Sequence, residues 1–75
     1  MKFEVVVSYR HGMSSPYRID KELSTPAREV SDIEAESYMA LAEGMGFTRH
    51  ETASQVFYSK QTDCNHVSEY IFWKK

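Results

Sequence analysis

The turn Asp63-Cys64-Asn65-His66 is the first place in this sequence where residue types and spacing could do chemistry. A thiolate and an imidazole two residues apart can bind zinc, but a structural zinc site uses two such pairs and this chain has one. Cys64 and His66 also lack the fixed geometry that a thiol nucleophile and its base need. The sequence therefore predicts a solvated hairpin turn, with no metal and no cofactor.

The remaining candidates for chemistry are weaker. Ser14 and Ser15 lie outside any nucleophile-elbow pattern. Gly44-Met45-Gly46 follows a helical pattern instead of opening one, so it does not resemble a phosphate cradle. A chain of 75 residues also has little room for a buried pocket of small-molecule size. We therefore expect neither an enzyme nor a small-molecule substrate.

Composition and charge indicate a soluble globular class. Hydrophobic residues make up 41% and charged residues 27% of the chain, and the net charge is −2. The single cysteine cannot form an internal disulfide, which favours a reducing compartment. The first ten residues are too short and too charged for a signal peptide or a membrane span. We expect one compact domain over residues 1–75, cytoplasmic and without membrane contact.

Alternating apolar residues predict the strands. Residues 3–9 place Phe3, Val5 and Val7 on one face, which is typical of a strand with one buried side. Residues 17–23 either pair back as a second strand or stay a loop. Residues 47–52 are expected to form a loop, and 54–60 and 67–75 an antiparallel hairpin.

One helix is predicted over residues 26–45. Thr25 can cap it, Pro26 suits its first position, and Gly46 suits its end. The expected buried stripe is Val30, Ile33, Ser37, Leu41 and Gly44. A competing start exists because residues 31–34 fit a capping box, which would begin the helix at Asp32. The apolar pattern continues on both sides of that point, so the longer helix is preferred.

These elements predict an α+β fold. It is a small antiparallel sheet of three or four strands, in the order β-(β)-α-β-β, with one amphipathic helix packed on one face. Burying Glu69 without a partner would cost several kcal/mol, so Tyr70 and Phe72 are placed beneath the helix. The opposite face then carries apolar residues that one helix cannot cover. They form the first predicted partner-binding surface: Val6, Phe57, Ile71 and Trp73.

Three kinds of cover would suit this second face. Trp73 could fold over the sheet edge or the loop over residues 11–24 could lie across it, a second copy could pack against it, or another macromolecule could bind there. One such macromolecule is single-stranded nucleic acid, because Phe57 and Trp73 could stack bases near Lys60, Lys74 and Lys75. Glu69 within the same surface argues against that alternative.

The acidic residues predict a second surface. Residues 23–46 carry one basic and five acidic groups, and four of these acids are assigned to one helix face: Glu29, Asp32, Glu36 and Glu43. This face is either a solvated side or a docking site for a protein with a basic surface. The resulting hypothesis is a small non-enzymatic protein-binding module that binds itself or a host protein, in the manner of an inhibitor encoded by a phage or mobile element. The alternatives are a single-stranded nucleic-acid-binding module and a homodimeric structural domain.

Overall fold

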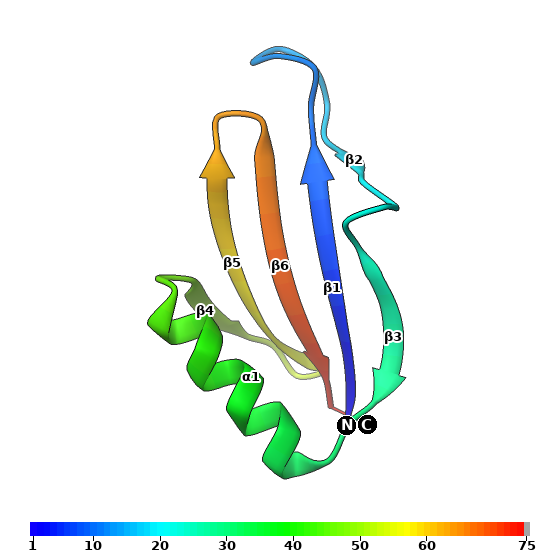
Figure 1. Ribbon diagram of the computed structural model, residues 1–75, viewed down its shortest axis with the longest axis vertical. Helices are drawn as coiled ribbons and strands as arrows, with labels where there is room; N and C mark the ends of the chain where they lie inside the picture. Colours follow the sequence, from blue (N-terminus) through cyan, green and yellow to red (C-terminus); the bar gives the residue numbers. More distant parts are fainter. Residues whose placement is uncertain (75) are drawn as a thin grey trace.

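A computed structural model describes residues 1–74 of the chain. It contains a six-stranded antiparallel sheet and one helix on one face of it (Figure 1). The elements in chain order are β1 (Lys2–Tyr9), β2 (Arg18–Ile19), β3 (Thr25–Glu29), α1 (Asp32–Gly44), β4 (Thr48–Glu51), β5 (Gln55–Asp63) and β6 (His66–Trp73). The predicted α+β class is confirmed, but the strand count exceeds the three or four expected.

The long strands β1, β6 and β5 form the centre of the sheet. The strand order is β2-β1-β6-β5-β4, and β3 pairs with β1 on the same side as β2. Phe72 on β6 lies opposite both Phe3 on β1 and Val56 on β5. These three side chains, with Tyr58, are buried under the helix. The predicted inner face of the sheet is therefore confirmed.

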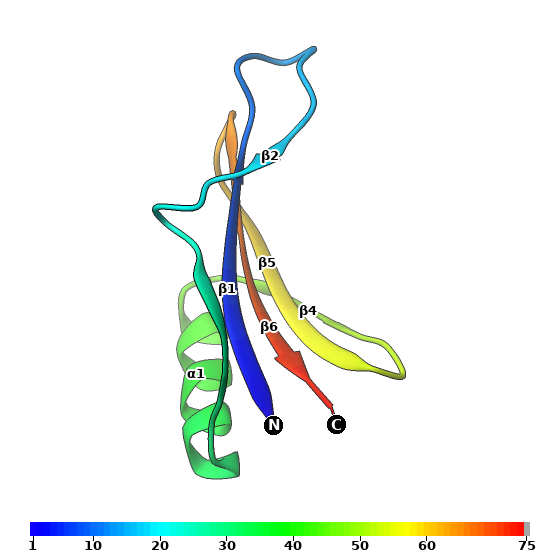
Figure 2. The same ribbon diagram turned by 90° about the vertical axis from the view of Figure 1, so that its right-hand side faces the viewer.

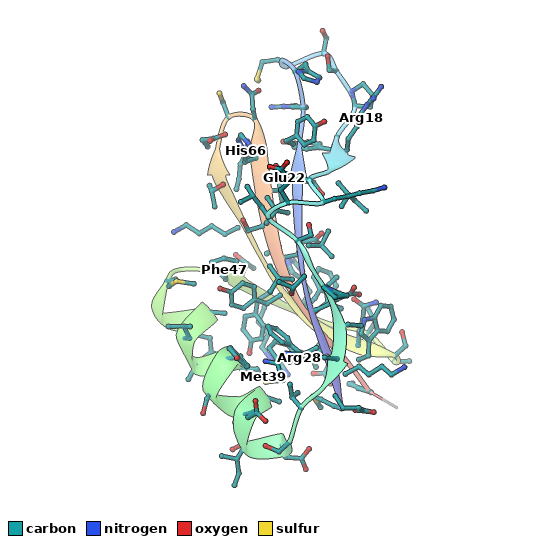
Figure 3. The ribbon with its side chains drawn as sticks, turned by 45° about the vertical axis from the view of Figure 1, so that its right-hand side comes forward. Arg18, Glu22, Arg28, Met39, Phe47 and His66 are labelled. Atoms are coloured by element: carbon teal, nitrogen blue, oxygen red, sulfur yellow. The ribbon has the colours of Figure 1, made fainter. Side chains whose placement is uncertain are left out.

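Stacked rings build the core on this inner face. The Phe3 ring lies 4.8 Å from that of Phe72 and 4.6 Å from that of Tyr38 on the helix. Phe47 packs against Tyr70 at 5.1 Å. Figure 3 shows Met39 and Phe47 between α1 and the sheet. Aromatic rings thus form the centre of the core, with aliphatic residues around them.

The predicted helix start was wrong, and the competing start is the observed one. Ser31 caps the helix, and its side chain accepts a hydrogen bond from the Glu34 backbone N–H at 3.1 Å. Residues 25–29 form β3 instead, because the free edge of β1 offers backbone partners to them. Pro26, which cannot donate a backbone hydrogen bond, is tolerated there since β3 is an edge strand at a register shift.

The predicted buried stripe of the helix was also wrong. Ile33 is 78% exposed and Leu41 is 52% exposed. Ser37 and Gly44 are exposed as well, and Val30 is buried but precedes the helix. The residues that face the sheet are Ala35, Tyr38, Met39 and Ala42. Small alanines let the helix approach the aromatic core closely, and the larger aliphatic side chains are left in solvent.

The helix ends as predicted. Gly46 has a φ of +85°, the left-handed conformation that a side chain disfavours. The Phe47 N–H donates to the Ala42 carbonyl at 3.0 Å, and the Gly46 N–H donates to the Glu43 carbonyl at 3.1 Å. These two bonds form a Schellman motif. The chain then enters β4, where a loop over 47–52 was expected, because residues 48–51 pair with the free edge of β5.

Residues 17–23 were predicted to form either a strand or a loop. They contain only a two-residue strand, β2, which pairs with the end of β1. Figure 2 shows the loop before β2 rising past the end of the sheet. It also shows α1 on one side of the sheet, with the turn between β4 and β5 projecting away from the helix. Figure 3 places Arg18, Glu22 and His66 at this far end, away from the helix. No element of residues 1–74 lies across the second face of the sheet, which we call the outer face.

Candidate protein-binding surface

The outer face is ordered by the register of the three central strands. Three of its rows carry the predicted binding residues: Lys2, Trp73 and Gln55 in the first; Glu4, Ile71 and Phe57 in the middle; Val6, Glu69 and Ser59 in the third. A fourth row, Ser8, Val67 and Gln61, follows the third. The four predicted binding residues therefore do share one face. All four are half-buried by their neighbours in the sheet. Their apolar side chains are neighbours on this face, since Ile71 lies beside Phe57, diagonal to Val6, and two residues before Trp73 on the same strand.

Trp73 is fixed in place by a hydrogen bond. Its indole Nε1 donates to Glu4 Oε1 at 2.8 Å, from the neighbouring strand. The ring therefore lies over the sheet and is not folded over its edge. Beside it is an open hollow of about 530 Å³, lined by Met1, Lys2, Glu4, Ala27, Glu29, Trp73 and Lys74. An anchored ring next to an open hollow suits the binding of a partner's side chain.

His50 extends the patch onto β4, and it was not among the predicted binding residues. The register places His50 opposite Phe57. The two rings stack with centroids 4.8 Å apart, and the His50 Nε2 lies 3.3 Å from the Ser59 hydroxyl. Because residues 47–52 were expected to be a loop, the pairing that places this ring was missed.

The basic side chains assigned to a nucleic-acid platform are engaged within the chain where the structure describes them. Lys60 donates to the Met45 carbonyl at the end of α1, at 2.7 Å. Lys74 binds the Glu51 carboxylate at 2.6 Å, and Arg49 binds the same group at 3.1 Å. These hydrogen bonds, first from Lys74 and then from Arg49, lower the pKa of the Glu51 carboxyl. Lys75 lies outside the described residues.

The outer face itself carries Lys2 against Glu4 and Glu69. Phosphate groups need a local excess of positive charge, which this arrangement does not supply. The geometry therefore favours a protein partner over single-stranded nucleic acid.

The predicted acidic helix face is only partly assembled. Glu29 lies on β3, with a carboxylate oxygen 3.7 Å from the Met1 amino group. Asp32, Glu36 and Glu43 follow one another along the helix at a spacing of four and seven residues, and we call them the acidic flank. No ion pair to these three occurs within residues 1–74.

Glu43 links the acidic flank to the core. The buried Tyr58 hydroxyl donates to its Oε1 at 3.1 Å. Burial, and then this hydrogen bond, raises the pKa of the Tyr58 phenol. The carboxylate is therefore engaged within the chain, which leaves Asp32 and Glu36 as the acids of the flank that are free to meet a partner.

Replacing Tyr58 with phenylalanine is expected to lower the free energy of unfolding by about 1 kcal/mol, since one buried hydrogen bond is lost. The raised pKa also gives a pH dependence. The folded state favours the neutral Tyr58 phenol. The contribution of this phenol to the free energy of unfolding is therefore complete below about pH 10, its pKa in the unfolded chain. That contribution is lost as the pH rises through the higher pKa of the folded state. Urea unfolding from pH 8 to 11 should show a smaller alkaline loss for Tyr58→Phe than for wild type. Tyr17→Phe, in an exposed loop, is the control and should match wild type.

The Asp63–His66 turn is held by its own hydrogen bonds. The Asp63 carboxylate lies 2.9 Å from His66 Nδ1 and accepts from the Asn65 N–H at 2.7 Å. These hydrogen bonds, that with His66 first, lower the pKa of the Asp63 carboxyl. Cys64 is exposed. Residues 1–74 hold no group of three or more His, Cys, Asp or Glu side chains placed to bind a metal ion.

Comparison with protein families, with curated proteins and with solved structures gives no match to this chain. Within residues 1–74, no helix has both the length and the apolar character needed to cross a bilayer. A functional assignment therefore rests on the geometry of the outer face and of the acidic flank.

Proposed function

We propose that the protein is a non-enzymatic protein-binding module whose binding surface is the outer face of the sheet. The observation that supports this most strongly is the apolar patch of Val6, Ile71, Phe57 and Trp73 on a face that no described element covers. Aromatic groups at the centre of such a patch are the residue types that most often anchor protein interfaces. A patch of this kind in water is also an association site by its physical nature.

A photo-crosslinking amino acid tests this proposal before a partner is known. A benzophenone side chain is placed at Phe57 on the outer face and, as the control, at Tyr17 in the exposed loop. In cells that make the protein, illumination should give a discrete covalent protein adduct from position 57 and none from position 17. The absence of an adduct at 57, or the same adduct from both positions, would reject the outer face as the binding surface.

The acidic flank supports a second candidate partner, a host protein with a basic surface. Asp32 and Glu36 have no ion pair among the described residues, and the adjoining Ile33 is 78% exposed. Acidic groups beside an exposed aliphatic side chain suit a basic surface with an apolar contact at its centre. An inhibitor of phage or mobile-element type would act by occupying such a surface.

Salt dependence separates this second candidate from the first. Binding through the acidic flank should weaken as salt is raised from 50 to 500 mM, about tenfold or more, because the flank interacts through exposed charges. Glu36→Lys should weaken it by a similar factor, and Glu22→Lys, remote from the helix, should not. Binding to the partner that is independent of salt and of Glu36 would exclude the acidic flank.

A further inference from the structure

The two rows of the outer face that flank Ile71 carry opposite charges. Lys2 lies in the first row, and Glu69 lies in the third. Neither has an ion-pair partner within residues 1–74. Four residues along a strand span about 13 Å, so Lys2 and Glu69 cannot reach each other within one chain. Lys2 lies opposite Glu29 of β3 in the register, whereas Glu69 lies between Val6 and Ser59 and has no basic neighbour on the adjoining strands. Glu69 would therefore need a second molecule to be neutralised by a direct contact.

A two-fold axis places these charges together. Consider an axis that lies between two outer faces and crosses the strands at the middle row. This axis places the first row of each copy over the third row of the other copy. Lys2 of each copy then lies within one strand spacing, about 5 Å sideways, of Glu69 of the second copy. The same charge pair forms twice, as an isologous interface requires.

The apolar residues obey the same symmetry. Ile71 and Phe57, in the middle row, meet their own counterparts across the axis. Val6 of one copy lies over the first row of the other, where Trp73 borders the 530 Å³ hollow. An aliphatic side chain directed at an open hollow adds buried apolar area without displacing an ordered group. The symmetry therefore pairs apolar residues as well as opposite charges.

Glu4 is the carboxylate of the middle row, and this symmetry brings it near its own counterpart. The Trp73 indole holds its carboxylate by a 2.8 Å hydrogen bond. Because Trp73 is in the first row, that bond draws the Glu4 carboxylate away from the axis. Like charges at the middle row are thereby separated.

The other simple two-fold arrangement is less favourable. An axis running along β6 would lay Glu69 over Glu69 and would place Lys2 over Gln55. That arrangement puts like charges together and leaves the lysine unpaired.

We infer that the occupant of the outer face is a second copy of this chain, related by a two-fold axis across the strands at Ile71 and joined by reciprocal Lys2–Glu69 pairs. This inference rests on the proposed function, since it names the partner of the same surface. The second copy converts the outer faces of two sheets into the interior of a sandwich, with the helices on its two outer sides.

A charge-exchange experiment tests the inference. Light scattering after size exclusion, at about 100 µM and low salt, should give wild type a mass twice the 8.7 kDa of one chain. Lys2→Glu and Glu69→Lys should each weaken self-association at least tenfold, because each dimer would then hold two like-charged contacts. An equimolar mixture of the two variants should recover the dimer, since both contacts become opposite in sign. Lys21→Glu and Glu22→Lys are matched controls remote from the face and should remain dimeric.

Three results would overturn the inference: a monomeric wild type, single variants as dimeric as wild type, or a mixture that stays monomeric while circular dichroism shows both variants folded. A monomeric wild type whose position 57 still crosslinks to a different protein would overturn the second copy alone. A monomeric wild type without any adduct at position 57 would overturn the proposed function as well.

Discussion

Replacing Phe72 with alanine is expected to lower the free energy of unfolding by about 3–5 kcal/mol, the usual cost of removing a fully buried aromatic ring. Phe72 has no exposed surface, and it lies on the central strand in contact with the rings of Phe3 and Tyr58. In a domain of this size, each kcal/mol shifts the melting temperature by about 4–8 °C. Thermal melting should therefore show a fall of tens of degrees, or no cooperative transition at all.

The neighbouring residue provides the control for this prediction. Trp73→Ala removes a larger side chain from the next position of the same strand, but that side chain lies on the outer face. At low protein concentration, where the outer face is uncovered, Trp73→Ala should lower the free energy of unfolding by less than half as much as Phe72→Ala. A larger loss for Trp73→Ala than for Phe72→Ala would mean that the assignment of the two faces is inverted.

The second large effect is expected for the outer face. The double variant Phe57→Ser and Ile71→Thr should keep the fold, because both positions are in contact with solvent and the new residues are compatible with strands. It should weaken binding to the partner at least about 100-fold, since central apolar anchors of an interface contribute about 2 kcal/mol or more. Titration calorimetry measures binding to a separate partner, and sedimentation measures self-association.

A matched variant on the helix separates this effect from a general loss of surface hydrophobicity. Ile33→Ser with Leu41→Ser also removes two exposed apolar side chains, but from the solvent side of α1. Outer-face binding should be unchanged in it. Equal losses in the two double variants would show that binding does not depend on the outer face.

The faces of the sheet were predictable because one residue decides them. The carboxylate of Glu69 would be costly to bury, and a strand alternates its side chains, so fixing Glu69 outside also fixes Phe72 inside and Trp73 outside. The same alternation assigned Val56 and Tyr58. The position of a residue along its strand is sufficient to predict which face it lies on. The observed register is needed to tell which residues of neighbouring strands lie side by side.

The helix was harder to predict because its sheet-facing residues have little hydrophobic signal. Ala35 and Ala42 are buried, whereas Ile33 and Leu41, which dominate an apolar pattern, are exposed. Close approach to a layer of aromatic rings rewards small side chains, and this tertiary demand is not visible in the helix sequence. The capping box at Ser31 was visible, and local capping chemistry located the start better than the apolar period did.

The short edge strands could not be predicted from apolar pattern. Every residue of β3 and of β4 is exposed, so neither has an alternation to detect. They form because the edges of β1 and β5 offer unpaired backbone groups. For the binding surface, this meant that the sequence identified Trp73 and Phe57 but missed His50 and the hollow beside Ala27.

The fluorescence of Trp73 gives the most direct measurement of whether a protein covers the outer face. It is the only tryptophan of the chain, and its ring lies on this face. At about 0.1 µM, acrylamide should quench its emission readily. As the concentration rises to about 200 µM, or as the protein crosslinked at position 57 is added, the emission should shift to shorter wavelength and become protected from acrylamide. A spectrum and a quenching constant that stay the same across these conditions would contradict the account, since the face would then be either already covered within one chain or bound by no protein.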